Sequence, residues 1–147
     1  MGTYAIAEPS FSHLTLSSRL VSELAQARST LRMTTECIDL AVIVSAGGEL
    51  DASNEATWRR LLGEAAAAAG PPGPLVVDTS GLDFMGCCAY AALAEEAERC
   101  RQRGVQLRVV SNQPVVARVV AACGLSELLP VDDSVDAALS VFDSPDW

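Results

Sequence analysis

The chain has 147 residues, of which half are hydrophobic and a fifth are charged, and its formal net charge is −9. This length predicts a single domain, and so large an apolar fraction excludes an intrinsically disordered chain. Only 10 basic residues, all of them arginine, stand against 19 acidic ones, which disfavours nonspecific binding to nucleic acid or to an anionic membrane surface.

The first element in chain order is an N-terminal extension, residues 1–30. Residues 1–13 show no clear period, whereas apolar residues from Leu16 to Leu31 recur at the spacing of a helix. Two interpretations stay open. The extension is either an amphipathic helix, packed on the domain or on a second copy of the chain, or a partly disordered leader.

Two strands and a helix are expected next. The patterns of residues 31–36 and 40–45 predict strands, and the second is a continuous apolar run, typical of a strand buried on both faces. The glycines at 47–48 are expected to end this strand, and Ser53 is expected to cap the helix that follows. The proline- and glycine-rich segment 70–74 ends that helix. Its apolar stripe comprises Trp58, Leu61, Leu62 and Ala65.

The second half of the chain alternates between strand and helix. The short link between the first two strands favours antiparallel pairing, and the later helical crossovers favour parallel pairing. This pattern predicts an α/β domain with a mixed β-sheet of four to five strands and helices packed on it. Functional loops are expected at the carboxyl ends of the strands. The remaining expected strands are 75–77, 107–110 and 129–131, and the remaining expected helices are 88–103, 114–123 and 134–142.

Cysteine and histidine usage bears on compartment and cofactors. The chain has five cysteines and shows neither a secretory signal nor an apolar run long enough to cross a membrane, so we expect a cytoplasmic protein with mostly reduced thiols. The cysteine spacing matches no zinc motif, and the single histidine, His13, lies in the extension, so no metal site is expected. The absence of lysine excludes a Walker-type nucleotide site, and no cofactor is expected, although a weak phosphate contact at a helix N-terminus stays open.

The most informative segment follows the third strand. It begins with Asp78-Thr79-Ser80-Gly81 and ends with Met85-Gly86-Cys87-Cys88-Ala89 at the start of a helix. This segment resembles the signature of STAS domains, the family of bacterial anti-sigma factor antagonists, in which Asp-Leu-Ser-Gly is followed by an apolar pair and by Asp-Ser-Ser-Gly. The resemblance covers residues 31–142 and leaves 143–147 as an acidic tail. Further segments resemble the family in the same order: Gly48–Asp51, Arg103–Leu107, Cys123–Leu125, Leu128–Val131 and Ser134–Leu139.

The resemblance implies a STAS-like fold and a regulatory protein-binding module that is not an enzyme. Such a module sequesters an anti-sigma factor, itself an ATPase and serine kinase, and thereby releases a sigma factor. The acidic charge balance leads us to expect no contact with nucleic acid or membrane, and whether two copies of the chain associate stays open. The residues expected to contact the partner are Gly48, Glu49, Leu50, Asp51, Met85, Gly86, Cys87, Cys88, Ala89 and Tyr90.

The chain departs from the family signature at the phosphoacceptor. In the family, the anti-sigma factor phosphorylates the second serine of Asp-Ser-Ser-Gly, and the added charge breaks the complex. Residues 86–89 here are Gly-Cys-Cys-Ala, so Cys88 occupies the phosphoacceptor position. A thiol is not a substrate for a serine kinase, and Thr79 and Ser80 are not at the acceptor position. The usual switch is therefore expected to be absent.

Three explanations of these cysteines stay open. Small residues are tolerated there and the module always binds, or a thiol switch replaces the phosphate switch, or the site is degenerate and the protein has another role. A thiol switch would involve Cys87 and Cys88, since a helix N-terminus favours a thiolate, with Cys100 and Cys123 as further candidates. Cys100 and Cys123 lie on the apolar faces of two expected helices, Cys123 on the same face as Val115. The favoured interpretation of both cysteines is burial in the core.

Two further alternatives concern the thiols and the acidic end of the chain. A cysteine-dependent enzyme is disfavoured because no general base accompanies Cys87 or Cys88 in the domain. From Glu127 onward the chain carries six acids and no base. This end is either a solvated surface that favours solubility or an acidic contact for a basic partner.

Overall fold

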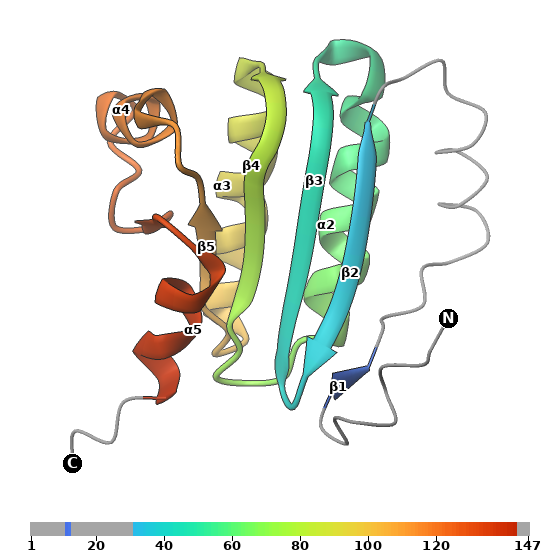
Figure 1. Cartoon of the computed structure of the whole chain (residues 1–147), viewed down its shortest axis with the longest axis vertical. Coiled ribbons are helices and arrows are strands. Elements are labelled where there is room, and N and C mark those ends of the chain that lie inside the picture. The colour runs from blue at the N-terminus through green and yellow to red at the C-terminus, as the bar shows by residue number, and fades with distance from the viewer. Residues whose placement is uncertain (1–10, 13–30, 144–147) are drawn as a thin grey trace.

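A computed structural model describes residues 11–12 and 31–143 of the chain (Figure 1). The two interpretations of the extension therefore lie outside the described residues, apart from the short strand β1. The acidic tail lies outside them as well, except for Asp143 at the end of the last helix.

One mixed sheet organises the domain, with its strands in the spatial order of the chain. The first three strands pair antiparallel, and the pairs from β3 to β6 are parallel. This confirms the predicted mixed sheet with an antiparallel start, and β1 adds a two-residue edge that the sequence pattern did not predict. The strands are β1 (Phe11–Ser12), β2 (Arg32–Ile38), β3 (Ala41–Leu50), β4 (Leu75–Met85), β5 (Leu107–Val110) and β6 (Val131–Asp132).

The described helices cover both faces of the sheet. Helices α2 and α3 lie side by side behind it in Figure 1, and α5 lies on the opposite face. The main core lies between the sheet and α2, α3 and α4, while α5 covers a smaller cluster built on Ile43, Val76 and Val110. The helices are η2 (Ala52–Asn54, a 3-10 turn), α2 (Glu55–Ala68), α3 (Cys87–Gln102), α4 (Pro114–Ala122) and α5 (Val135–Asp143).

Strands β3 and β4 are longer than the sequence pattern predicts. The expectation that the glycines at 47–48 end the strand predicted at 40–45 is wrong, because β3 continues to Leu50 through two register shifts. Residues 78–85, expected as the segment leading out of a strand, extend β4 to Met85. A Cβ atom at Gly81 would lie 3.0 Å from the carbonyl oxygen of Ala46, so glycine permits the close backbone approach there. Pairing with a neighbouring strand thus overrides the local tendency of glycine to break a strand.

The expected apolar stripe of the first helix is confirmed, since all four of its members are buried. Trp58 is fully buried, and its indole N–H donates to the carbonyl of Ala89, 3.3 Å away in the first turn of α3. At the other end of the helix pair α2 and α3, the Arg103 guanidinium donates to the carbonyls of Ala66 and Ala69, at 2.9 Å and 3.2 Å. These carbonyls lie at the end of α2, where the Ala66 carbonyl also accepts the Ala69 N–H at 3.1 Å, and a cation there complements the helix dipole. The two ends together fix α3 against α2.

We expect Trp58→Phe to destabilise the domain by about 1–3 kcal/mol. The smaller ring leaves a cavity, and the contact with the Ala89 carbonyl is lost. Urea unfolding followed by far-ultraviolet circular dichroism measures the loss. Ala67→Ser on the exposed side of the same helix is the control and should stay within about 0.5 kcal/mol of the wild type. A Trp58→Phe variant as stable as the wild type would contradict the importance of this contact.

Candidate functional site

The residues expected to contact a partner gather at one edge of the sheet. Strands β3 and β4 are parallel and end together, with Leu50 paired to Met85. The Gly86 N–H then donates to the Leu50 carbonyl at 2.8 Å, and α3 begins at Cys87. The two segments 48–51 and 85–90, called the candidate site below, are therefore held side by side by backbone pairing.

Asp51 organises the first half of the candidate site. Its carboxylate accepts the Ser53 N–H at 2.9 Å and the Ser53 hydroxyl at 2.5 Å, while its own N–H donates to the Asn54 side chain at 3.0 Å. This reciprocal capping box starts η2, which leads into α2. The prediction that Ser53 caps this helix is therefore wrong. Ser53 is the donor, because the turn begins two residues earlier than the helical periodicity indicates.

The expected contact residues differ in exposure. Glu49 and Cys87 are exposed, and Asp51, Met85, Gly86 and Cys88 are partly exposed. The other expected contacts, Gly48, Leu50, Ala89 and Tyr90, are buried. Only the first two groups can form a surface for a partner in this conformation, and the buried side chains support that surface from below.

The start of α3 is an uncapped helix N-terminus. Its N-cap residue is Gly86, which has no side chain to accept a hydrogen bond from the first turn. Cys88, partly exposed in that turn, occupies the expected phosphoacceptor position. The positive end of the helix dipole lies at the candidate site, and the first turn holds no acidic residue that would offset it.

The structure separates the thiols that were grouped together from sequence. All five cysteines are free thiols. Cys100 is fully buried, as predicted, and burial raises the pKa of its thiol to about 11. The prediction that Cys123 is a core residue is wrong, because α4 ends at Ala122 and Cys123 is its exposed C-cap residue.

Cys87 and Cys123 both act electrostatically on Tyr90. Burial raises the pKa of the Tyr90 phenol, and electrostatic repulsion from Cys123 and Cys87 raises it further. Both cysteines therefore lie within electrostatic range of this phenol, although they are 36 positions apart in the chain. Sequence spacing gives no signal for this arrangement, because it depends on α4 packing beside the start of α3.

A pocket beside the candidate site was also missed from sequence. It has a volume of about 250 Å³ and lies between the end of β4, the start of α3 and helix α4. The Gln113 side chain bridges its α4 side to β4 by donating to the Leu82 carbonyl at 3.0 Å. Val115, expected on the apolar stripe of its helix, is instead 46% exposed at the pocket. The apolar and sulfur-bearing lining comprises Leu82, Met85, Cys87, Tyr90, Val116 and Val119.

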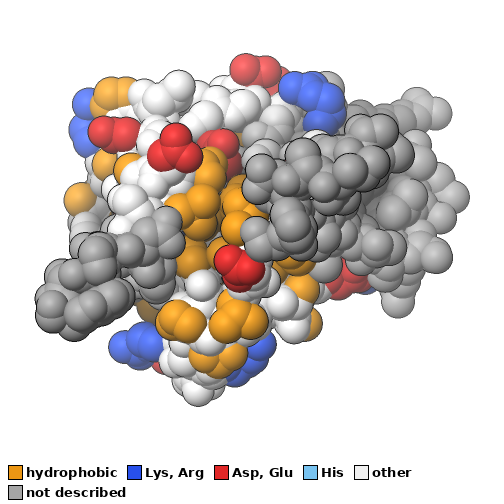
Figure 2. Space-filling view, turned by 60° about the horizontal axis from the view of Figure 1, so that its bottom comes forward, with side chains coloured by type: hydrophobic (Ala, Val, Ile, Leu, Met, Phe, Trp, Pro, Cys, Tyr) orange, Lys and Arg blue, Asp and Glu red, His pale blue; other side chains and the backbone are white. Residues whose placement is uncertain are grey.

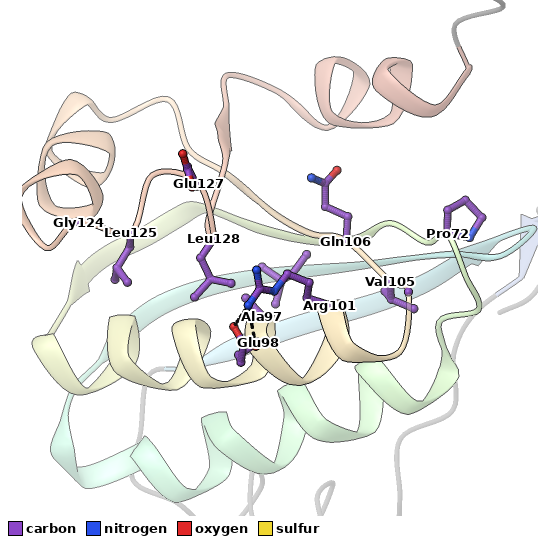
Figure 3. Close-up of a pocket in the computed structure, with 12 residues that line it drawn as sticks. Pro72, Ala97, Glu98, Arg101, Val105, Gln106, Gly124, Leu125, Glu127 and Leu128 are labelled. Atoms are coloured by element: carbon purple, nitrogen blue, oxygen red, sulfur yellow. Dashed lines mark hydrogen bonds and ion pairs between the residues drawn. The ribbon is translucent and has the colours of Figure 1, made fainter. Parts of the chain in front are cut away.

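A larger hollow of about 490 Å³ lies at the other end of α3 (Figure 3). It separates the C-terminal half of α3 from the segment 124–128, with Leu125 and Leu128 pointing toward the helix. The Arg101 guanidinium donates to both carboxylate oxygens of Glu98 at 2.8 Å on its α3 side. Figure 2, turned so that the end away from the candidate site comes forward, shows apolar side chains gathered between charged ones.

Neither a metal centre nor a membrane span emerges from the part of the chain that the structure describes. Residues 11–12 and 31–143 contain no group of three or more histidine, cysteine, aspartate or glutamate side chains that could hold a metal ion. No helix among these residues is both long and apolar enough to span a bilayer.

Comparison with known proteins assigns the family. The STAS domain family matches residues 32–138, most of the chain. The chain therefore belongs to the STAS domain family, as the signature around Cys88 indicated, and the class of fold is a STAS domain.

Several relatives of this chain come from mycobacteria. The chain is 58% identical over 132 residues to Rv2638 of Mycobacterium tuberculosis, whose name describes it provisionally as an anti-anti-sigma factor; the match covers 90% of this chain and 89% of the relative. It is 54% identical over 112 residues to the anti-sigma-F factor antagonist RsfA of the same organism, and this match covers 76% of this chain and 88% of the relative. A crystal structure of an anti-sigma factor antagonist from Mycobacterium paratuberculosis superposes with a TM-score of 0.70 at 26% identity, covering 80% of this chain and 98% of the other.

The match to Rv2638 also concerns the extension. Residues 31–147 are fewer than the 132 matched residues, so the match includes part of residues 1–30. The family signature showed no resemblance there. Part of the extension is thus similar to a relative even though it lies outside the matched STAS region.

We expect the stability difference between the wild type and Asp51→Asn to narrow as the pH falls. Hydrogen bonds from Ser53 hold the pKa of the Asp51 carboxyl below its ordinary value of 3.8. The stabilisation is therefore present above pH 3.8 and is lost as the pH falls through the lower pKa of the folded state. Asparagine also caps a helix but does not titrate. Thermal unfolding of both proteins at a series of pH values measures the difference, and a constant difference would contradict this assignment.

Proposed function

We propose that this protein binds an anti-sigma factor and thereby releases a sigma factor, without control by serine phosphorylation. The observation that carries this proposal is the 54% identity over 112 residues to a protein named as an anti-sigma-F factor antagonist. The candidate site supports it, since segments 48–51 and 85–90 form one partly exposed edge. The protein performs no chemistry in this proposal; it competes with the sigma factor for one partner.

Cys88 supports the absence of the phosphate switch. A phosphate on a side chain at the start of α3 would bring about two negative charges to a surface that a partner must cover. Cys88 carries a thiol where the family signature has the accepting serine hydroxyl. The complex would then respond to the amounts of the competing proteins and not to kinase activity.

The binding test uses the purified anti-sigma-F factor of Mycobacterium tuberculosis, the class of partner in the name of RsfA. We expect calorimetry to detect a complex when the two proteins are mixed at micromolar concentration. Cys88→Glu should weaken it at least about tenfold, because it places a charge at the acceptor position. Gln102→Glu, which adds the same charge at the far end of α3, is the matched control and should leave affinity unchanged. No binding to this or any other ATPase-type anti-sigma factor at about 100 µM would contradict the proposal.

A kinase assay tests the missing switch separately. Incubation with the same anti-sigma factor and ATP should leave the mass of the wild type unchanged, whereas Cys88→Ser should gain one phosphate. Phosphate on residues 79–90 of the wild type would overturn the assignment of Cys88 as an acceptor-equivalent position.

A thiol switch is the second candidate, and the exposure of Cys87 and Cys123 favours it. Both thiols are exposed, and both lie within electrostatic range of Tyr90 in the candidate site. A peroxide could oxidise the pair: the two thiols give up two electrons and two protons, one S–S bond forms, and the peroxide is reduced to two waters. The new bond would tie α4 to the start of α3 and alter the surface there.

We expect partner affinity to differ between the reduced and the peroxide-treated protein if this switch operates. Cys87→Ser and Cys123→Ser should each abolish the difference, and Cys37→Ser on β2 should retain it. Loss of the difference in Cys88→Ala alone would assign the switch to oxidation of that single thiol. Equal affinity of both forms of the wild type would remove the candidate.

A further inference from the structure

The pocket between β4, α3 and α4 lies beneath an unusual surface. Leu40, Phe84 and Val115 are the exposed large hydrophobic side chains of the described residues, at 54%, 54% and 46% exposure. Phe84 and Val115 both line this pocket, one from β4 and one from α4. Leu40 lies in the β2–β3 turn, at the opposite end of the sheet (Figure 1). Apolar exposure at the candidate-site end is therefore concentrated around one hollow.

The size and lining of this pocket suit one apolar side chain. Its volume of about 250 Å³ is below the roughly 300–1,000 Å³ of small-molecule sites. Two of its polar side chains already have partners within the chain. The Thr79 hydroxyl donates to the Val110 carbonyl at 2.8 Å, and the Gln113 amide donates to the Leu82 carbonyl. The pocket thus offers burial of apolar surface and few free hydrogen-bonding groups.

The rim of the pocket is acidic. Asp83 belongs to the lining and is exposed. Glu49 is the register partner of Phe84 on the adjacent strand, and Asp51 follows two residues later. The loops and strand ends that meet here, residues 46–53, 78–90 and 111–115, contain no arginine and no lysine. The charged side chains that these segments present to an inserting partner are therefore all carboxylates.

We infer that this pocket is an anchor site for one apolar side chain of a partner protein, flanked in that partner by arginine or lysine. The inference rests on the proposed function for the identity of the partner, and it adds the chemistry of the contact. Phe84 and Val115 close over the inserted side chain, and Asp83 and Glu49 pair with the flanking cations. Such a central apolar anchor with a charged rim is the usual arrangement of a strong protein–protein contact.

The thiol of Cys87 lines the pocket and allows a test that needs no partner. Three small disulfide probes are each equilibrated with the protein in the presence of a competing thiol reductant. The first probe carries an isobutyl group and an ammonium group. The second carries an isobutyl group and a carboxylate, and the third carries a hydroxyl and an ammonium group. Peptide mapping by mass spectrometry measures the occupancy of each cysteine. We expect the first probe to exceed both others at Cys87 by about fivefold or more, and to show no such preference at exposed Cys123. Equal occupancy of Cys87 by all three probes would overturn the inference.

A second arm uses the anti-sigma-F factor of Mycobacterium tuberculosis. Phe84→Ala and Val115→Ala should each weaken binding about tenfold, and Leu40→Ala, equally exposed at the far end of the sheet, should not change it. Asp83→Asn should weaken binding and reduce its salt dependence.

The two arms separate the failure of each proposal. Binding that is indifferent to Phe84→Ala and Val115→Ala would overturn the anchor site and leave the proposed function standing. A probe preference at Cys87 without any binding of an anti-sigma factor would support the anchor site and contradict the proposed function.

Discussion

The parallel pairing of β3 with β4 is the constraint on which the rest of the domain depends. It runs from Val42 opposite Leu75 to Leu50 opposite Met85, past the point where Gly81 approaches the Ala46 carbonyl. No side chain larger than hydrogen fits at Gly81 without a shift of the backbone. Because the two strands continue together beyond this point, both deliver their following helices to the same edge of the sheet. Segments 48–51 and 85–90 meet only for this reason.

The two helices that begin at this edge start in different ways. The turn before α2 is capped by the Asp51 carboxylate, so its free N–H groups already have an anionic acceptor. The start of α3 has Gly86 at the N-cap, with no side-chain acceptor. The family signature has aspartate at this position and serine at position 88. Residues 86–88 of this chain therefore lack both a capping carboxylate and an accepting hydroxyl, and the start of α3 keeps its positive end open to an outside group.

Sequence reasoning predicted the parts of this domain that depend on local pattern. The apolar stripe that begins at Trp58 and the mixed sheet were predicted because periodicity and alternation are local signals. The extension of β3 through its glycines was not, since pairing with β4 decides it. The cap at Asp51 was missed because Ser53 is also a good cap by residue type. The electrostatic effect of Cys123 on Tyr90, and the pocket between β4, α3 and α4, depend on how α4 packs, which no spacing in the chain encodes.

The pocket that would hold a partner side chain does not include the residue that would control binding: Cys87 lines it, and the adjacent Cys88 does not. Exposure of Phe84 and Val115 depends on β4 and on the placement of α4, which the Gln113 amide secures to the Leu82 carbonyl. None of these contacts involves the side chain of Cys88. Replacing the accepting serine by cysteine therefore leaves the apolar anchor and its acidic rim intact. A protein built in this way can lose phosphate control without giving up the proposed contact area, whereas thiol chemistry at Cys87 would act within that area.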